Sequence, residues 1–253
     1  MKSRMIEIDD NVFLVAFSIV WRNRMPFAAA ASILLATNAG HDFIDMPVAV
    51  AVLRALILMI VGYSAYRCLL SGGTIAGWQA VSAPNGRIPW RYAGVSLIIL
   101  SPILFLGIVW TAPGTGIGPS GWGEMGLGVV LVVIYAALYI LIGTALPEAA
   151  ERGDVALGEA FERGRRNYRA IGRALVLRVW LFRAATVLVM ITLNLSGVTT
   201  DFITPDSGEF DAAATGPMLL FNCSHVFAEC LNAIVLARAY RRFPVLSAGT
   251  ANS

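Results

Sequence analysis

The stretch GPMLLFNCSHVFAECLNAIVLARAY, residues 216–240, is long enough to cross a bilayer and yet carries four strongly polar side chains near its middle. With 100° between successive residues, Asn222, His225, Glu229 and Asn232 fall within about 80° of one another on a helix. A polar stripe in hydrocarbon must face protein or a water-filled cavity. The segment therefore predicts a helix packed inside a membrane bundle.

The composition of the whole chain also predicts a membrane protein. Of its 253 residues, 57% are hydrophobic and 14% are charged, whereas soluble domains average about 25% charged residues. One soluble core cannot bury that much apolar surface, so lipid is the expected solvent. The net charge of +3 is too small to indicate a nucleic-acid partner. The three cysteines lie in or beside apolar segments and form no disulfide framework or CxxC motif.

The apolar segments predict an all-α integral membrane protein with six transmembrane helices. A spanning helix needs about 20 mostly apolar residues, and the whole chain reads as a single polytopic domain over residues 1–253. The expected spans, of which the first is short, are residues 26–39, 47–66, 92–112, 125–146, 174–195 and 216–240.

Basic residues predict the orientation of these spans. The connections 40–46, 113–124 and 197–215 contain acidic residues and no Lys or Arg, whereas the alternate connections and both ends are rich in Arg. The positive-inside rule places basic connections in the cytoplasm. We therefore expect a multi-pass protein of the bacterial cytoplasmic (inner) membrane with its N-terminus and C-terminus both cytoplasmic.

Residues 154–173 have the pattern of an amphipathic helix that lies on the cytoplasmic surface of the membrane. The apolar positions at three-four spacing are Leu157, Phe161, Gly164, Tyr168, Ile171 and Leu175. Arginines on the opposite face are expected to reach the headgroups of the anionic inner leaflet. These predicted headgroup contacts are Arg163, Arg165, Arg166, Arg169 and Arg173. An ordinary solvated helix face is the alternative interpretation.

Residues 9–24 predict a second interfacial helix, since their apolar run is too short to cross a bilayer. The sequence AFSIVWRN, residues 16–23, matches AFERGRRN, residues 160–167, at its Ala, Phe, Arg and Asn positions. Each block precedes a predicted span. The match suggests an internal duplication in which a surface helix followed by a helical hairpin occurs twice.

The segment LGEAFERGRRNYRAIGRALVLRVWL, residues 157–181, resembles the entry segment of poorly characterised bacterial polytopic membrane proteins. This group includes the membrane domain attached to some glycerophosphodiester phosphodiesterases. In that family a separate soluble domain performs the hydrolysis. The resemblance covers about thirty residues, and it implies a membrane-domain fold without any catalytic residue.

Charges inside the spans need partners, because an unpaired charge in hydrocarbon costs several kcal/mol. At 1.5 Å per residue, Glu229 lies roughly 16 Å and Arg183 roughly 14 Å from the cytoplasmic ends of their consecutive spans. We therefore expect these two side chains to pair. Arg54 is a second buried charge, nearer the external side. Its expected partners are Asp42, Asp45 or Glu124.

No pattern in the sequence indicates catalysis, a metal site or a cofactor. Ser-His-Asp and metallohydrolase arrangements are absent from it. The two histidines, His41 and His225, have different expected depths, which disfavours a haem with two histidine ligands. The cluster on the last span thus has two main interpretations, as hydrogen-bonding glue between helices or as a pathway for a proton or small solute.

The first interpretation predicts a non-enzymatic integral membrane subunit or accessory protein. Such a protein would act through helix packing and contact with anionic lipid, with a membrane-protein partner or a second copy of itself. The second interpretation predicts a small-solute or proton-coupled transporter that uses the polar stripe of the last span.

Overall fold

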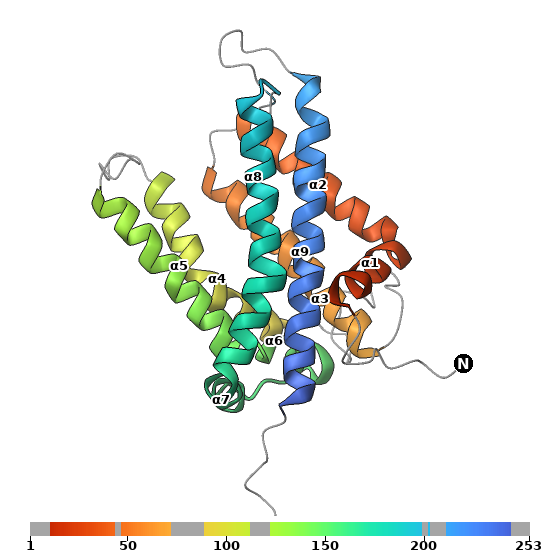
Figure 1. Ribbon diagram of the computed structural model, residues 1–253, viewed down its shortest axis with the longest axis vertical. Helices are drawn as coiled ribbons and strands as arrows, with labels where there is room; N and C mark the ends of the chain where they lie inside the picture. Colours follow the sequence, from red (N-terminus) through yellow and green to blue (C-terminus); the bar gives the residue numbers. More distant parts are fainter. Residues whose placement is uncertain are drawn as a thin grey trace, which may run out of the picture.

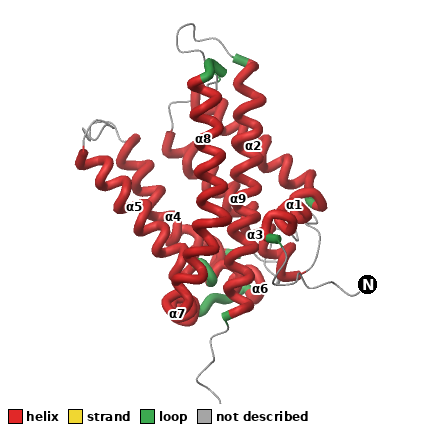
Figure 2. The backbone as a smooth tube through the Cα atoms, in the orientation of Figure 1, coloured by secondary structure: helices red, strands yellow, loops and turns green. Residues whose placement is uncertain are grey.

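The computed structural model of the chain describes residues 11–43, 47–71, 89–111, 122–198, 202 and 211–243. This part of the chain folds into helices and contains no strand (Figure 2). The helices are α1 (Val12–Arg22), α2 (Arg24–Phe43), α3 (Pro47–Ser71), α4 (Trp90–Thr111), α5 (Trp122–Ile142), α6 (Ala145–Arg152), α7 (Leu157–Leu175), the π-helical turn η2 (Val176–Trp180), α8 (Leu181–Leu195), the 3₁₀ turn η3 (Ala212–Ala214) and α9 (Thr215–Arg242).

Helix α9 is the centre of the bundle. It packs against α1, α2, α3 and α8, while α4 and α5 form a neighbouring pair and α7 lies across the lower end (Figure 1). Every residue from 231 to 237 is buried. A helix that is apolar on all sides is expected to be enclosed by other helices, and this half of α9 fits that rule.

Three helices of the described part are long and apolar enough to cross a membrane. They run over Ala49–Leu70, Leu157–Leu195 and Ala212–Arg242. A fourth candidate is the pair Gly126–Ile142 and Ala145–Arg152, if these helices, bent by 49°, form one span. The prediction of an all-helical protein suited to a membrane is therefore confirmed, with three to four candidate spans. The first and third predicted spans fall in α2 and α4.

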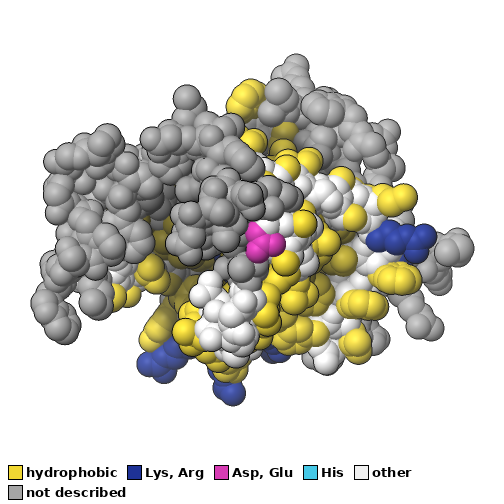
Figure 3. All heavy atoms as spheres, turned by 90° about the horizontal axis from the view of Figure 1, so that it is seen from above, with side chains coloured by type: hydrophobic (Ala, Val, Ile, Leu, Met, Phe, Trp, Pro, Cys, Tyr) yellow, Lys and Arg dark blue, Asp and Glu magenta, His cyan; other side chains and the backbone are white. Residues whose placement is uncertain are grey.

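A wide apolar surface covers the outer helices. No residue of α8 is buried, and Leu188 and Leu195 are 63% and 82% exposed. On α5, Val129 and Val133 are each 60% exposed. Figure 3 shows apolar side chains over much of the described surface seen from above, with basic side chains at its margin. A surface of this extent needs lipid or another protein to cover it.

Two asparagines bend the chain in the same way at the ends of the repeated blocks. Asn23 separates α1 from α2 with φ −117° and ψ 33°, and Asn167 interrupts α7 with φ −120° and ψ 19°. Each side-chain amide donates a hydrogen bond to the carbonyl oxygen four residues earlier, at 2.8 Å to Ile19 and 3.0 Å to Arg163. This bond replaces part of the helical ladder. The four-residue match therefore has a shared local geometry.

The buried face of α7 differs in part from the predicted apolar face. Gly164, Ile171 and Leu175 are buried as expected, but Leu157, Phe161 and Tyr168 are 42–51% exposed. With 100° between successive residues, the buried side chains of both halves share one face, which is centred near Ala160, Gly164 and Ile171. Phe161 and Tyr168 lie at one edge of that face, and Leu157 is the first residue of the helix.

Gly164 allows α7 to cross α5 in backbone contact, and we expect Gly164→Ala to destabilise the protein. A Cβ atom at this position would lie 2.1 Å from the carbonyl oxygen of Leu141. Because backbone cannot yield as a flexible side chain does, the expected loss is about 1–3 kcal/mol. Gly158→Ala is the matched control, since nothing lies within 4 Å of its added Cβ. Thermal unfolding in detergent measures both variants, and equal midpoints would contradict this contact.

Candidate functional site

The polar stripe of α9 carries a charged pair. Arg183 of α8 donates from Nη2 to Oε1 of Glu229, which confirms the pairing expected from depth along the chain. Asn232 donates from Nδ2 to the other carboxylate oxygen at 3.4 Å. The Glu229 side chain is 15% exposed and the Arg183 side chain 30% exposed. The pair therefore joins α8 to α9 and keeps both oxygens of the carboxylate engaged.

A second polar link joins α2, α3 and α9. Asn222 is fully buried; its Nδ2 donates to the carbonyl oxygen of Met218 at 2.9 Å, and its Oδ1 accepts from Asn38 Nδ2 at 3.4 Å. Asn38 Oδ1 in turn accepts a hydrogen bond from Arg54 Nη1. We define the intramembrane polar cluster as the side chains of these two links together with His225, which lies on the same stripe of α9. Its members are Asn38, Arg54, Arg183, Asn222, His225, Glu229 and Asn232.

The partner of Arg54 is thus an amide that the sequence analysis missed. Asp45 lies outside the described residues, and the side chains of Asp42 and Glu124 lie outside them as well. Asn38 stood in the sequence as an isolated amide near the end of an apolar segment. A polar residue at such a position suggests a buried hydrogen bond, but the sequence does not show which neighbouring helix the amide faces.

His225 has a different environment from the rest of the stripe. Its ring meets Phe221 edge to face, with ring centroids 4.4 Å apart. Among the described contacts there is no hydrogen bond from His225 to Glu229. The proton exchange that a transport pathway would require between these two groups therefore has no direct bond in this conformation.

Five tyrosines from α3, α4 and α5 gather beside the charged pair, and we call them the tyrosine cluster. Tyr63 and Tyr66 both pack against Tyr92, with centroid distances of 4.9 Å and 6.0 Å. Tyr135 and Tyr139 lie 5.5 Å apart. All but Tyr135 are buried. The sequence analysis missed this cluster, although Tyr63/Tyr66 and Tyr135/Tyr139 have the spacing of neighbours on one helix face.

The tyrosine hydroxyls lie near the carboxylate of Glu229. A Cβ atom at Gly62 would be 2.9 Å from Tyr92 Oη and 3.8 Å from Glu229 Oε2, so both groups rest against the backbone of α3. Tyr66 and Tyr139 also interact electrostatically with Glu229. Gly62 therefore leaves room for both groups beside α3.

Three buried atoms around Glu229 retain hydrogen-bonding capacity. Tyr66 Oη, Asn232 Oδ1 and Arg183 Nε have no hydrogen-bond partner among the described residues. Buried polar atoms are normally satisfied by protein or by ordered water. These atoms can therefore bond to a water molecule or a small polar solute. Within the described ranges, no three His, Cys, Asp or Glu side chains converge as metal ligands would.

Arg163 was predicted to contact lipid headgroups, and that prediction is wrong. Its side chain is 4% exposed. It donates from Nη1 to Thr144 Oγ1 at 3.1 Å, pairs with Glu148 Oε2 at 3.7 Å, and lies over the ring of Tyr240 at 5.0 Å. The reason is that Glu148 is itself buried where α5 bends into α6, and only a neighbouring cation offsets that buried charge.

The other predicted headgroup arginines lie on the surface of the protein. Arg165 and Arg166 pair with Glu162 at 3.0 Å and 3.4 Å, and the Arg165 hydrogen bond holds the pKa of Glu162 below its ordinary value. Arg169 donates from Nε to the hydroxyl of Tyr168 at 2.8 Å. The predicted headgroup contacts that are exposed are Arg165, Arg166, Arg169 and Arg173.

Comparison of the chain with protein-family models, with curated proteins and with solved structures found no match. The resemblance of residues 157–181 to bacterial polytopic membrane proteins thus stays a prediction. The function has to be argued from the geometry of the cluster and of the surfaces around it.

Proposed function

We propose that this protein is a non-enzymatic integral membrane subunit or accessory protein of the bacterial cytoplasmic membrane. In this proposal it works through helix packing and contact with anionic lipid, in an assembly with another membrane protein or with a second copy of itself. The observation that carries the proposal is that two polar residues of α9, Asn222 and Glu229, tie neighbouring helices together.

The tie has two parts. Asn222 holds α2 and, through Asn38, the arginine of α3, while Glu229 holds α8. Hydrogen bonds between polar side chains stabilise helix contacts in membranes by about 0.6–2 kcal/mol each. A network of this kind specifies how the helices are rotated against one another, which is a structural role.

The apolar outer surface supports the assembly part of the proposal. None of the residues of α8 is buried, and α5 exposes four valines between residues 129 and 133. Lipid covers part of this surface, and a partner helix would cover the rest. Close van der Waals packing between helices is one of the forces that drive helix association in a bilayer.

The proposed topology has six spans. Three helices meet the length and composition criteria, the bent pair of α5 and α6 is the fourth span, and α2 and α4 are the other two. Helices α1 and α7 lie at the cytoplasmic interface in this proposal. The matching bends at Asn23 and Asn167 support an internal duplication of surface helix and hairpin. A parallel pair of repeats keeps both copies in the same orientation.

Thiol labelling tests the topology. Single cysteines at Asp206 and Arg166, in a chain whose native cysteines are replaced by alanine, are treated with a membrane-impermeant reagent. We expect Asp206→Cys to react from the outside and Arg166→Cys to react only after the membrane is opened. Reaction of both positions from the same side would contradict the proposed orientation.

Gentle extraction tests the assembly. The full chain is crosslinked in the membrane, extracted in a mild detergent and weighed by native mass spectrometry. We expect a stoichiometric complex, either with one other membrane protein or with itself, before and after crosslinking. A monomer that carries no protein in either sample would contradict the subunit role.

The unpartnered atoms beside Glu229 favour one second candidate, a proton or small-solute transporter. Tyr66 Oη, Asn232 Oδ1 and Arg183 Nε offer a short polar route around the carboxylate. In this case Glu229→Gln, reconstituted in liposomes, should lower proton-coupled flux at least about tenfold, as the loss of a proton-transfer group does in general. Flux that is unchanged in the folded variant would remove this candidate.

A further inference from the structure

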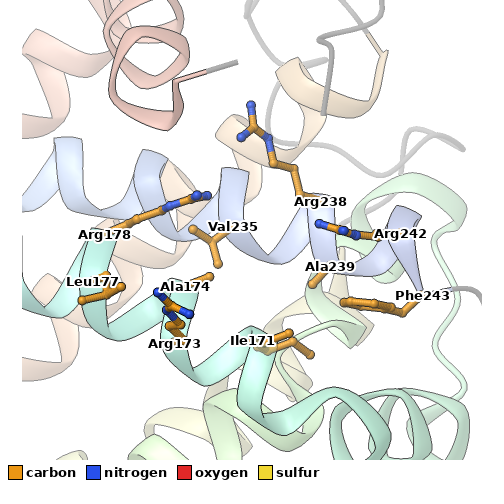
Figure 4. Close-up of a pocket in the computed structure, with 11 residues that line it drawn as sticks. Ile171, Arg173, Ala174, Leu177, Arg178, Val235, Arg238, Ala239, Arg242 and Phe243 are labelled. Atoms are coloured by element: carbon orange, nitrogen blue, oxygen red, sulfur yellow. The ribbon is translucent and has the colours of Figure 1, made fainter. Parts of the chain in front are cut away.

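A basic groove lies between the end of α7 and the end of α9. Its volume is about 430 Å³. Arg173 and Arg178 line one wall, which continues from α7 into η2, and Arg238 and Arg242 line the α9 wall (Figure 4). In this view Arg178 and Arg242 extend toward one another. Arg238 also lines the groove, but its side chain extends away from these two in the same view. The groove thus brings together arginines of two walls that are about sixty residues apart in the sequence.

The groove has an excess of positive charge. Its lining contains no Asp or Glu, and among the described residues there is no ion pair for Arg173, Arg178 or Arg242. The acidic side chains of this end serve other arginines: Glu148 pairs with Arg163, Glu151 with Arg241, and Glu162 with Arg165 and Arg166. Like charges held around one space repel, and an anion placed between them relieves that repulsion.

A π-helical turn forms part of the groove wall. Val176–Trp180 adopts this geometry between two regular helices, and Arg178 lies within it. A π-turn shifts the side chains that follow it around the helix axis, and such turns are frequent at functional sites. Here the turn lies where a surface helix becomes a membrane span, with Arg178 directed at the groove.

The remaining lining of the groove is apolar. Val235 contributes apolar surface from α9, and Leu177, which is 51% exposed, contributes it from η2. Guanidinium groups form paired hydrogen bonds with phosphate oxygens. A cationic space beside exposed apolar side chains therefore suits a phosphate group that is joined to an acyl chain.

We propose that this groove binds the phosphate group of an anionic phospholipid from the cytoplasmic leaflet. The inference rests on the proposed membrane orientation, in which the arginine-rich end of α9 faces the cytoplasm. Basic pockets between membrane helices on that side are suited to headgroups with one or two phosphates. The groove differs from the surface arginines of α7 because its cations come from α7, η2 and α9 and line one space.

Lipid titration of the purified full chain tests this site. The protein is delipidated in a mild detergent and titrated with phosphatidylglycerol, cardiolipin, neutral phosphatidylcholine or glycerol 3-phosphate, and binding is measured by native mass spectrometry. We expect the two anionic lipids to bind in preference to the others. Each arginine near the headgroup is worth about fivefold in affinity, so R178Q/R242Q should bind roughly 30-fold more weakly.

Two control variants separate the groove from general surface charge. R165Q/R166Q removes the same charge from the exposed face of α7 and should weaken binding less than about fivefold. R178K/R242K keeps the charge but loses the paired hydrogen bonds of the guanidinium groups, so its affinity should fall between those of the wild type and R178Q/R242Q. If circular dichroism shows that R178Q/R242Q does not fold, the single variants R178Q and R242Q are titrated instead. Each should lose about fivefold in lipid affinity.

Equal losses in R178Q/R242Q and R165Q/R166Q would overturn the proposal, as would full binding by R178Q/R242Q. Glycerol 3-phosphate that binds as tightly as the lipids would assign the groove to a soluble phosphate instead. The titration uses the isolated chain, so a missing protein partner would contradict the subunit role and leave this result standing.

Discussion

Replacing Glu229 with leucine is expected to lower the free energy of unfolding by about 3–5 kcal/mol, because Arg183 loses its counter-charge inside the bundle. Arg183 Nε already lacks a partner among the described residues, so the guanidinium would depend even more on water. Asn232 would lose its bond to the carboxylate as well. Denaturant titration in mixed micelles measures the change.

The double variant R183M/E229L is the control for this prediction. Removing both charges removes the attraction between them and also the free-energy cost of burying each charge, so the double variant should be more stable than E229L alone. A double-mutant cycle then yields the coupling energy of the pair. For residues in contact this energy is about 0.5–3 kcal/mol. If E229L were as stable as the wild type, or if the two changes were additive, the ion pair would have no role in holding α8 on α9.

Arg163→Met is expected to cost about 3–5 kcal/mol, for the same physical reason at a different place. Glu148 has a side-chain exposure of 5%, and its remaining basic neighbour, Arg152, is 4.0 Å away and largely exposed. Methionine fills a similar volume without charge. The change would therefore leave a buried carboxylate where α5, α6 and α7 meet, and it would remove the hydrogen bond to Thr144.

Arg165→Met is the matched control, since it lies two residues away on the same helix and pairs with Glu162 at the surface. Exposed ion pairs contribute about 0–1 kcal/mol, so this variant should unfold close to the wild type. R163M/E148L should recover part of the lost stability. Equal effects of Arg163→Met and Arg165→Met would mean that Arg163 is a surface arginine after all.

The charged pair shows how far local reasoning reaches. Arg183 and Glu229 belong to helices joined by one connection, and the rise per residue places them at the same depth. Two consecutive antiparallel helices are usually neighbours, so depth alone was enough to predict the contact. For Arg54 the same argument named Asp42, Asp45 or Glu124, whose side chains lie outside the described residues, and it overlooked the amide of Asn38.

The arginines of α7 show where local reasoning ends. The sequence analysis placed Arg163 with the charged face, but on a helical wheel it lies at the edge of that face, beside Ala160 and Gly164. The close crossing of α7 and α5 at Gly164 buries this edge. A wheel assumes a straight helix with one partner. In the structure, Arg163 contacts the α5–α6 bend and α9 at once.

By itself the sequence determined the helical class, lipid as solvent, the polar stripe of α9 and its pairing with α8, because periodicity, hydropathy and helix rise are local properties of a chain. Only the tertiary structure decided that Asn38 accepts a hydrogen bond from Arg54, that the tyrosine cluster lies beside the charged pair, that Arg163 is buried, and that arginines of α7, η2 and α9 line one groove. These contacts join helices that are distant in the sequence. Their distances depend on the crossing angle and rotation of each helix, and the packing of the whole bundle sets both.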